Sequence, residues 1–349
     1  MSTQFLAAVI TPATVTPAQR LSAGQLISER YRRSWPDEPP LTPAAEAENL
    51  FAGPQSEWRV NWAVFDNARF DGAGGETALA WAQLTGSHIH NTHWAALYLL
   101  THPSAEDAGH GPALRAALWQ AARAEAQTRG VRVIGSWGVD RYPGQLQFLR
   151  EAGFHQTLSN AAVRLDMRAV PGTLLEAWTA RPAPASGADP HRLHRWTRVP
   201  DEYLGRMADL QAVINDMPRG DSELGELVYT PQHIREREAQ AALDGETRFL
   251  VAAEDTRSGE LVAYTETYWG PDRAALVYQG ATAVRRGSRG QGLGRWVKAD
   301  MLRWVQTAAP GAEYIRTNVA EENDAMNAMN AALGFRPYAV TSEWEVRLS

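Results

Sequence analysis

The chain has 349 residues, a formal net charge of −6, 13 tryptophans and no cysteine. One hydrophobic core rarely serves a chain of this length, so two domains are expected. A hydrophobic fraction of 44% argues against extensive disorder. The absence of cysteine excludes disulfides, thiolate catalysis and cysteine-ligated zinc. A negative net charge without a basic block argues against nucleic acid as the main partner.

No apolar run approaches the length that is needed to span a membrane. The segment Phe5–Val15 has no basic residue before it, so it lacks the pattern of a signal peptide. We therefore expect a cytoplasmic protein without a membrane partner, and we allow for a homodimer.

Early in the chain, a polar stretch at 36–43 is expected to join two helices. Further on, His88 and His90 are predicted to lie on one face of a strand, with His93 nearby. Histidines can hold a transition metal, but no carboxylate lies close in sequence to complete a ligand set. We therefore predict that the chain binds no metal ion.

A glycine-containing turn at Ala108–Ala113 precedes an amphipathic helix at Leu114–Gln127 and a strand at Val131–Trp137. Gly153 and Phe154 follow, and after them comes a run in which apolar residues alternate with polar ones, as in a half-buried strand. The apolar positions of that run are Val163, Leu165 and Met167.

Small and proline-rich residues fill the stretch 180–190. They can form neither a helix nor a packed strand, which is typical of a linker. We therefore predict a first domain at 1–179, a linker at 180–190 and a second domain at 191–349.

The second half repeats the order of elements of the first. A strand at Leu276–Val284 leads into the loop Arg289–Gly294, an amphipathic helix at Arg295–Ala308 and a strand at Tyr314–Asn318. After these come Asn323, a short helix, Leu333, Gly334 and Phe335, and a last apolar alternation at Val340, Trp344, Val346 and Leu348.

The spacing of glycines indicates that the two halves are copies of one domain. Gly292 and Gly334 are separated by the same number of residues as Gly111 and Gly153. A helix and a strand lie between the glycines in each half. Such self-similarity at a fixed offset is the signature of a repeat, and this repeat has the length of a whole domain.

The loop Arg289–Gly294 is typical of an anion site. Its three alternating glycines free the backbone to turn tightly, and a loop that opens a helix gathers N–H groups at the positive end of the helix dipole. A Walker loop would need Lys and then Ser or Thr after the last glycine, where this chain has Arg295. The glycine spacing and the late position also fit a dinucleotide fingerprint poorly.

Arg289, Gly292 and Gly294 match the pattern Gln/Arg-x-x-Gly-x-Gly/Ala, which resembles the pyrophosphate loop of the GCN5-related N-acetyltransferases (GNAT). The order of strand, loop, helix, strand, Asn323 and Leu-Gly-Phe is also similar to that family, and the duplication resembles its tandem members, among them the mycothiol synthases. The resemblance implies an α/β (α+β) fold of two tandem GNAT domains. Each would be a mixed, mostly antiparallel sheet with a splayed parallel strand pair and flanking helices.

The resemblance further implies that acetyl-CoA binds as cosubstrate between the splayed strands. The strand backbone would pair with the pantetheine arm, and the loop amides would hold the pyrophosphate. Arg285 and Arg286 either reach the 3′-phosphate or are solvated surface residues. The implied cofactor residues are Ala281, Thr282, Ala283, Val284, Arg289, Gly290, Gln291, Gly292, Leu293, Gly294, Arg295, Asn318 and Asn323.

Acetyl transfer to an amine requires removal of the ammonium proton, and a carboxylate with a raised pKa is the usual base. Glu266 is the only carboxylate in its apolar strand, and Tyr264 and Tyr268 share its face. We predict that Glu266 is the general base, with a structural or substrate-binding role as the alternative. We also predict that Asp216, Tyr264, Glu266 and Tyr268 bind the acceptor, although Asp216 also fits a solvated loop.

Many family members protonate the leaving thiolate with a tyrosine seven residues after the asparagine of the motif. In this chain that position is Asn330, and an amide is not an acid near neutral pH. Tyr338 would take this role, or the thiolate would take its proton from water. Asn323 would bond the pantetheine or the leaving sulfur, in addition to capping the next helix.

The first half lacks this chemistry and is expected to be a degenerate copy. Ala108 replaces the leading arginine of the loop, Glu106 and Asp107 would repel a pyrophosphate, and Pro112 removes an amide donor. We predict that the C-terminal domain moves an acetyl group from acetyl-CoA to a primary amine of a small molecule by direct attack. The competing interpretation is a non-catalytic acyl-CoA-binding protein with a sensing or structural role.

Overall fold

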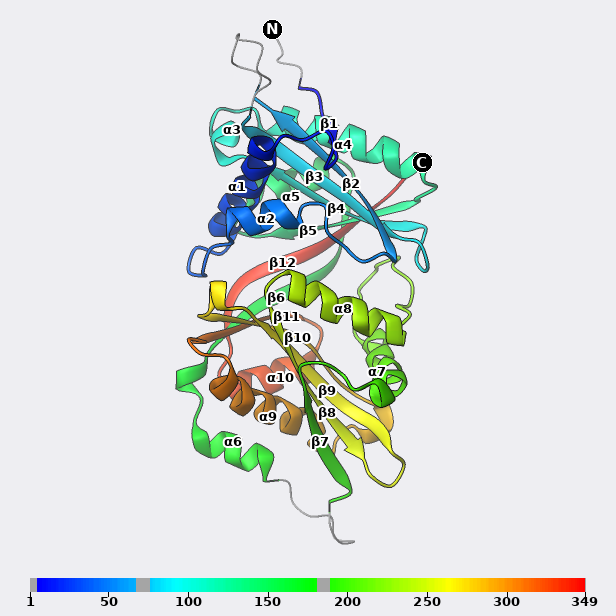
Figure 1. Cartoon of the computed structure of the whole chain (residues 1–349), viewed down its shortest axis with the longest axis vertical. Helices are drawn as coiled ribbons and strands as arrows, with labels where there is room; N and C mark the ends of the chain where they lie inside the picture. Colours follow the sequence, from blue (N-terminus) through cyan, green and yellow to red (C-terminus); the bar gives the residue numbers. More distant parts are fainter. Residues whose placement is uncertain (1–4, 67–75, 181–188, 349) are drawn as a thin grey trace. The chain divides into compact units, whose positions relative to one another are not determined.

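The computed structural model of the protein describes residues 5–66, 76–180 and 189–348. Its backbone divides into two compact units (Figure 1). Unit 1 consists of the chain up to Asn160 together with Arg219–Glu226 and the segment from Ala339 onward. Unit 2 consists of Ala161–Pro218 and Leu227–Tyr338.

This division does not coincide with the predicted sequence domains at 1–179 and 191–349. The last strand and the short segment at 219–226 come from the second half of the sequence but lie in unit 1. Most of the predicted linker, 181–188, lies outside the described residues. The domain boundaries therefore stay a prediction about the sequence.

Unit 1 contains a mixed, mostly antiparallel sheet in the order β1-β2-β3-β4-β5-β12. In this order β4 and β5 are the parallel pair, and β12 lies antiparallel to β5, from Thr341 opposite Val139 to Arg347 opposite Val133. The strands are β1 (Ala8–Ile10), β2 (Glu57–Phe65), β3 (Ala78–Ser87), β4 (Trp94–Thr101), β5 (Val133–Val139) and β12 (Arg336–Arg347), the last with its residues from Ala339 onward.

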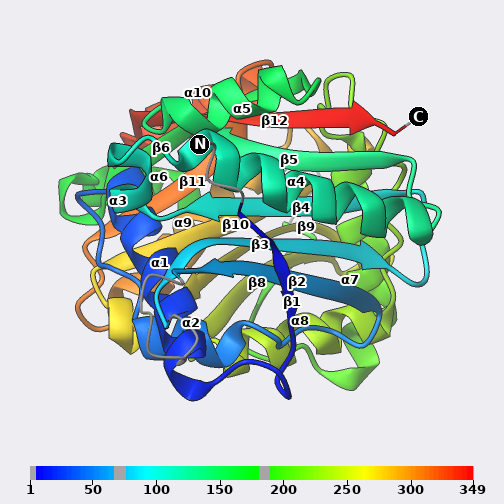
Figure 2. The same ribbon diagram turned by 90° about the horizontal axis from the view of Figure 1, so that it is seen from above.

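Helices cover both faces of this sheet, because successive strand residues point to opposite sides. On β2, Trp62 and Val64 pack in the same apolar cluster as Leu114 of α4. Ala63, which lies between them in sequence, packs instead with Leu26 of α1. Figure 2 shows α1 and α2 on one side of the sheet and α4 and α5 on the other. The helices are α1 (Pro17–Ser34), α2 (Pro43–Asn49), α3 (Pro103–Asp107), α4 (Gly111–Thr128) and α5 (Pro143–Glu151).

The buried carboxylate of Glu345 holds β12 and the segment 219–226 in unit 1. It accepts hydrogen bonds from the indole N–H of Trp94 at 3.0 Å and from the hydroxyl of Ser222. It also accepts from the backbone N–H of Glu223 at 2.8 Å. Three donors compensate the cost of burying this charge.

Unit 2 contains a second sheet in the order β6-β11-β10-β9-β8-β7. The strands β7 to β10 are antiparallel neighbours, whereas β10 and β11 run parallel. The strands are β6 (His155–Asp166, from Ala161), β7 (His191–Trp196), β8 (Thr247–Asp255), β9 (Glu260–Trp269), β10 (Leu276–Val284) and β11 (Tyr314–Ala320). The helices are α6 (Gly172–Thr179), α7 (Leu204–Gln211), α8 (Pro231–Leu243), α9 (Leu293–Ala308) and α10 (Asp324–Leu333).

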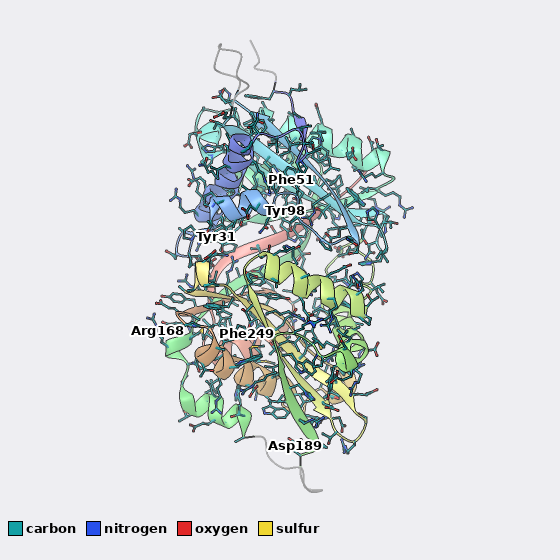
Figure 3. All side chains as sticks on the ribbon, in the orientation of Figure 1. Tyr31, Phe51, Tyr98, Arg168, Asp189 and Phe249 are labelled. Atoms are coloured by element: carbon teal, nitrogen blue, oxygen red, sulfur yellow. The ribbon has the colours of Figure 1, made fainter. Side chains whose placement is uncertain are left out.

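The same alternation divides the core of unit 2 into two layers. Phe249 on β8, which is labelled in Figure 3, packs against α9. Its ring meets that of Trp304 edge-on, with centroids 5.0 Å apart. The next residue, Leu250, points the other way and packs with Met207 of α7. Helix α9 therefore covers one face of the sheet, and α7 covers the face that also receives α8.

The elements predicted from periodicity are present, with shifted ends. The strand predicted at Leu276–Val284 has these bounds, and the stretch 36–43 joins α1 to α2 as expected. Helix α9 begins at Leu293 rather than Arg295, because the left-handed Gly292 is its N-cap. The predicted fold class is confirmed: each unit has a mixed sheet with a parallel strand pair and helices on both faces.

Candidate functional site

The parallel strands β10 and β11 separate after a short paired section. Their Cα partners end at Tyr278 opposite Arg316, although β10 continues to Val284 and β11 to Ala320. Beyond this point the edge of β10 that faces β11 has no strand partner in the register. The predicted splayed pair is therefore present in unit 2.

A bulge in β10 lies where the strands separate. The register between β9 and β10 shifts between Gln279 and Thr282, so Gly280 and Ala281 of β10 lie opposite one residue of β9, Glu266. The hydroxyl of Thr317 on β11 donates a hydrogen bond to the carbonyl of Gln279 at 3.1 Å. Because a bulge bends its strand and interrupts pairing, the backbone of β10 after the bulge is left able to pair with an extended ligand.

The glycine loop adopts a backbone conformation that other residues avoid. Gly290 and Gly292 have φ angles of 79° and 76°, in the left-handed region that favours glycine. Gly292 is the N-cap of α9, so the loop presents the N–H groups at the start of a helix. A Cβ atom on Gly294 would lie 3.0 Å from the terminal methyl of Met329, so this glycine lets α10 approach α9 closely.

The end of β10, the loop and the starts of α9 and α10 enclose a pocket of about 530 Å³. Most of the predicted cofactor residues line it, whereas Ala281, Gln291 and Asn318 do not. The lining residues from the prediction are Thr282, Ala283, Val284, Arg289, Gly290, Gly292, Leu293, Gly294, Arg295 and Asn323. A pocket with apolar walls and a few convergent polar groups is the usual form of a ligand site.

Asp216 lies in the wall of this pocket, beside the glycine loop. Its carboxylate accepts hydrogen bonds from Arg286 at 3.1 Å and from Arg289 at 3.2 Å. Asp216 was predicted to bind the acceptor, and this role stays a prediction; in the structure its carboxylate is paired with two guanidinium groups. The same contacts reduce the positive charge that Arg289 offers to a phosphate.

Asn323 caps α10, as the sequence predicts. Its side-chain oxygen accepts a hydrogen bond from the backbone N–H of Met326 at 3.2 Å, which satisfies one of the free donors at the helix start. Asn323 also lines the pocket. Its contact with a ligand stays a prediction.

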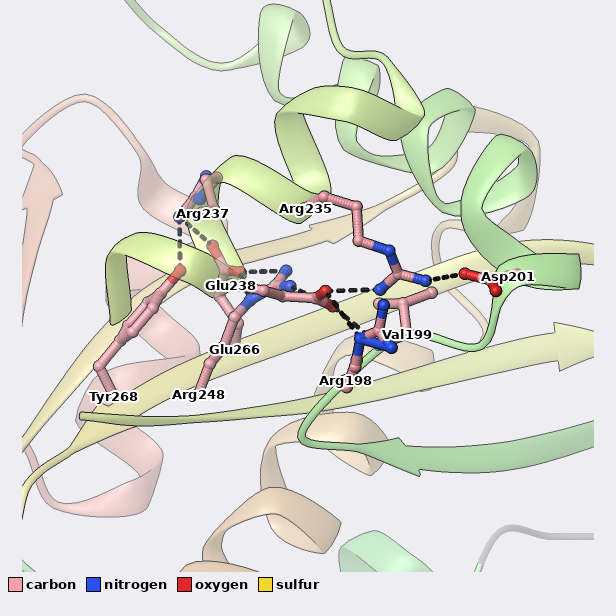
Figure 4. Close-up of polar contacts among 9 residues, drawn as sticks. All are labelled: Arg198, Val199, Asp201, Arg235, Arg237, Glu238, Arg248, Glu266 and Tyr268. Carbon is pink, nitrogen blue, oxygen red and sulfur yellow. Dashed lines mark hydrogen bonds and ion pairs between the residues drawn. The ribbon is translucent and has the colours of Figure 1, made fainter. Parts of the chain in front are cut away.

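Glu266 lies among buried charges on the face of the sheet that α7 and α8 cover (Figure 4). Arg248 on β8 donates two hydrogen bonds to Oε2 of Glu266, at 3.0 and 2.8 Å. Arg237 on α8 donates to Oε1 at 3.0 Å and to the hydroxyl of Tyr268 at 2.6 Å. The side chains of Glu266 and Arg248 are only 1% and 2% exposed, so each charge depends on the other for its compensation.

These ion pairs decide the pKa of Glu266. Burial alone would raise it, but Arg248 and Arg237, with a backbone hydrogen bond from Ala281, lower the pKa below its ordinary value of 4.5. The raised pKa that the sequence led us to expect is therefore wrong. A carboxylate held by two arginines is a weak proton acceptor near neutral pH, and a catalytic role for Glu266 stays a prediction.

The two tyrosines predicted to bind the acceptor share the face of Glu266 but differ in exposure. Tyr264 is 1% exposed and packs with Met207 in the core, where burial raises its pKa well above 10. Tyr264 is thus a core residue, because α7 covers it. Tyr268 is bonded to Arg237, whose side chain is 42% exposed, so these two side chains lie at the rim of the cluster.

Neither Tyr338, the predicted proton donor, nor Asn330, at the position where many family members have a tyrosine, lines the pocket. Tyr338 on β12 is half-buried, with the guanidinium of Arg164 4.4 Å from its ring centroid. Asn330 on α10 is 2% exposed, and neither polar atom of its side chain has a hydrogen-bond partner among the described residues. A buried amide without partners is costly.

In unit 1, the corresponding helix start is filled by the protein's own carboxylate. Glu106 is hydrogen bonded to Thr101, Arg115 and Tyr142, and its Oε2 lies where a Cβ on Gly111 would be. Pro112 is in the first turn of α4, where it removes an amide donor. These contacts support the prediction that the first half is a degenerate copy.

Sequence reasoning missed three cations of unit 2: Arg237, Arg248 and Lys298. Arg248 precedes an apolar run on β8, and Lys298 follows Gly294 by four residues on the same face of α9. Both are cations at positions where the pattern of the strand or helix predicts a buried apolar side chain, and this mismatch could have drawn attention to them. Arg237 gives no such signal, because it lies in a run of four consecutive charged residues, Arg235–Glu238.

Two other observations concern the described residues alone. The described residues contain no cluster of three or more His, Asp or Glu side chains placed to hold a metal ion. The imidazole Nε2 of His93 lies 3.2 Å from the backbone carbonyl oxygen of Glu223. None of the helices at 5–66, 76–180 and 189–348 combines the length and apolarity needed to cross a membrane.

Comparison with known proteins agrees with this geometry. The model of the acetyltransferase (GNAT) family matches residues 214–335, and no curated protein matches the chain. The structure is similar to a tandem GNAT protein from the clavulanic acid biosynthesis pathway, with a TM-score of 0.75, 22% identity and coverage of 99% of this chain and 98% of that one. It is also similar to a GCN5-related N-acetyltransferase from Sphaerobacter thermophilus, with a TM-score of 0.62, 15% identity and coverage of 98% and 95%.

The family match covers the bulged strand, the glycine loop, α9, β11 and α10, which together form the pocket. The structural similarity covers both units. Residues 214–335 thus match the model of the acetyltransferase (GNAT) family, and the chain as a whole has the fold of a tandem GNAT protein.

Proposed function

We propose that the protein is an acetyl-CoA-dependent N-acetyltransferase, and that unit 2 moves the acetyl group to a primary amine of a small molecule by direct attack. The observation that supports this most is the pocket between the separated strands. It combines an unpaired strand edge with a glycine loop at a helix N-terminus. These are the two features that a pantetheine arm and a pyrophosphate require.

In this proposal the loop holds the pyrophosphate through the amides of Gly290 to Gly294, with charge from Arg289 and Arg295. The backbone of Thr282–Val284 pairs with the pantetheine amides, and Asn323 bonds the arm from the start of α10. Acetyl-CoA supplies the activated acetyl group when it is bound.

The acceptor approaches from the face of the sheet that α7 and α8 cover, where Arg237 and Tyr268 reach the rim. Only the neutral amine attacks the thioester. Because Glu266 is ionised and paired with two arginines, we propose that it fixes Arg237 and Arg248 rather than accepting the proton. The amine then loses its proton to water, and turnover rises with pH as the neutral amine becomes populated.

The competing function is a non-catalytic acyl-CoA-binding protein. Two observations favour it: the lowered pKa of Glu266 and the amide of Asn330 at the position where family members have an acidic hydroxyl. Both functions require the pocket, so binding alone does not separate them.

Release of CoA thiol in the presence of a panel of small primary amines tests the proposed function. We expect the wild-type protein to release CoA in an amine-dependent way, and Gly292→Glu to abolish release. The substitution forces a side chain into a left-handed position at a cost of about 1–2 kcal/mol and places a negative charge against the pyrophosphate.

Gly245→Glu is the matched control, because Gly245 also has a positive φ, of 69°, and is exposed at the end of α8. It should keep wild-type turnover. Equal loss in both variants would mean that strain alone is responsible. Wild-type protein that binds acetyl-CoA but releases no CoA with any amine would favour the non-catalytic function.

Asp216→Asn tests whether this residue pairs with Arg286 and Arg289 at the pocket or binds the acceptor amine. Removing the carboxylate frees Arg286 and Arg289, and exposed pairs of this kind are worth about 0.2–1 kcal/mol each. We therefore expect the Kd of acetyl-CoA to fall by about three- to tenfold, with the KM of the amine unchanged. A raised amine KM with an unchanged Kd would instead support the acceptor-binding role predicted from the sequence. Asp221→Asn, in the same polar segment, should change neither.

Glu266→Gln should lower the free energy of unfolding by about 3–5 kcal/mol, because it removes the carboxylate that is hydrogen bonded to the buried Arg248 and leaves only the more distant Glu238, at 3.9 Å, as its counter-charge. Since folding lowers the pKa of Glu266, its contribution is complete above the ordinary value of 4.5 and is lost as the pH falls through the lowered pKa. Chemical denaturation at several pH values should show this acid-side loss in the wild type and not in the variant. Glu260→Gln, exposed on the same strand, should shift stability by less than about 0.5 kcal/mol.

The pH profile of turnover decides whether Glu266 is also a base. We expect the folded Glu266→Gln protein to keep the shape of the wild-type profile. Loss of an acidic limb in the variant would show that Glu266 accepts the proton and would contradict the role proposed here.

A further inference from the structure

Lys298 on α9 is the only lysine in the chain. Of the 34 Lys and Arg residues, the other 33 are arginines. It is 4% exposed. Its ammonium lies 3.5 Å from the side-chain oxygen of Gln279 and 5.5 Å from the ring centroid of Phe335. No carboxylate pairs with it among the described residues. A buried ammonium without a counter-charge is costly, so its position requires an explanation.

The partner of Lys298 lies where the strands separate. The amide nitrogen of Gln279 donates to the hydroxyl of Thr265 at 3.0 Å and to the carbonyl of Glu266 at 2.7 Å, and the backbone carbonyl of Gln279 accepts from Thr317. These bonds fix the side-chain oxygen of Gln279 toward α9. The ammonium of Lys298 is therefore held at the closed end of the gap between β10 and β11.

Lys298 does not itself line the pocket, but it lies on α9 one helical turn beyond a lining residue. Gly294, which lines the pocket, precedes it by one helical turn on the same face. A Cβ on Gly294 would touch Met329 of α10 and Val284 of β10. One helical turn further along α9, Lys298 contacts Phe335, which follows α10, and Gln279 of β10. A ligand that enters between the strands from the loop therefore ends toward Lys298.

Burial lowers the pKa of Lys298 to about 8, and no charged group contributes to this shift. The helix packs on α6, β8, β9 and β10, and the groups that face its ammonium are the neutral Gln279 and Phe335. A thiol has an ordinary pKa of about 8.5, so a proton can pass between this lysine and a thiolate near neutral pH. Arginine cannot do this, because its guanidinium stays protonated.

We propose that Lys298 is the proton donor to the departing CoA thiolate, and this rests on the proposed function. The bond between the amine nitrogen and the acetyl carbon forms, and the carbon–sulfur bond breaks. A proton moves from Nζ of Lys298 to the sulfur, and the attacking nitrogen, which enters as the neutral amine, releases one proton to water. The products are the acetylated amine, CoA thiol and a neutral lysine, which regains a proton from water. Lys298 thereby supplies the acid that Asn330 cannot supply.

The single lysine makes a direct test available. Protein labelled with ¹⁵N-lysine should give one Nζ signal, whose titration reports the pKa of Lys298 in the empty protein, with CoA and with desulfo-CoA, which lacks the sulfur. We expect CoA to shift this titration, because a thiol beside the ammonium couples the two protons, and desulfo-CoA to leave it close to the empty protein. Identical titrations with both ligands would place Lys298 away from the sulfur and overturn the proposal.

Kinetics provide the second arm. Lys298→Met and Lys298→Arg should each lower kcat by about 100-fold or more, as expected for loss of a general acid, with the Kd of acetyl-CoA within about twofold of wild type. The methionine variant should remain folded, because it removes a desolvated charge and keeps the chain length. A Lys298→Arg protein with wild-type kcat would show that charge alone is needed and would overturn proton donation.

The two proposals fail in different ways. If CoA does not bind at all, the proposed function fails. If CoA binds and the wild type turns over, but the variants keep wild-type kcat, only the role of Lys298 fails.

Discussion

The early end of the pairing between β10 and β11 is the constraint on which the candidate site depends. One extra residue in β10 bends this strand, and the hydroxyl of Thr317 donates a hydrogen bond to the carbonyl of Gln279 at the point of separation. A continuous ladder would bury the edge of β10 and close the pocket. Instead, the unpaired edge of β10 ends beside the glycine loop and the start of α9. One short segment of chain therefore offers the strand backbone to the extended arm of a ligand and the loop amides to its phosphates.

Charge in unit 2 is arranged so that most ionised groups already have a partner. Glu266 is held by Arg248 and Arg237, and Asp216 by Arg286 and Arg289. The first set is buried and gives the sheet a fixed polar centre, whereas the second set is exposed and can open for a phosphate. Lys298 differs from both because it is buried and has only neutral neighbours. This difference is why its proton, rather than that of an arginine, can take part in chemistry.

The sequence predicted the parts of the site that depend on local pattern. The glycine loop, the helix after it, the strand before it and the cap at Asn323 all follow from short-range rules of periodicity and backbone freedom. The environment of Glu266 could not be predicted in this way, because its partners come from a different strand and a helix, and only the folded sheet brings them together. The position of β12 in unit 1 likewise depends on the buried contacts of Glu345, which join residues far apart in the sequence.

The measurement that tests the account most directly is a calorimetric titration of acetyl-CoA into the purified full chain, analysed for stoichiometry. The account predicts one site per chain, because the loop of unit 2 is open, whereas Glu106 and Pro112 fill the corresponding helix start in unit 1. Two sites per chain would contradict the assignment of the first half as a degenerate copy. No binding would mean that the fold of a tandem GNAT protein is present without its cosubstrate site.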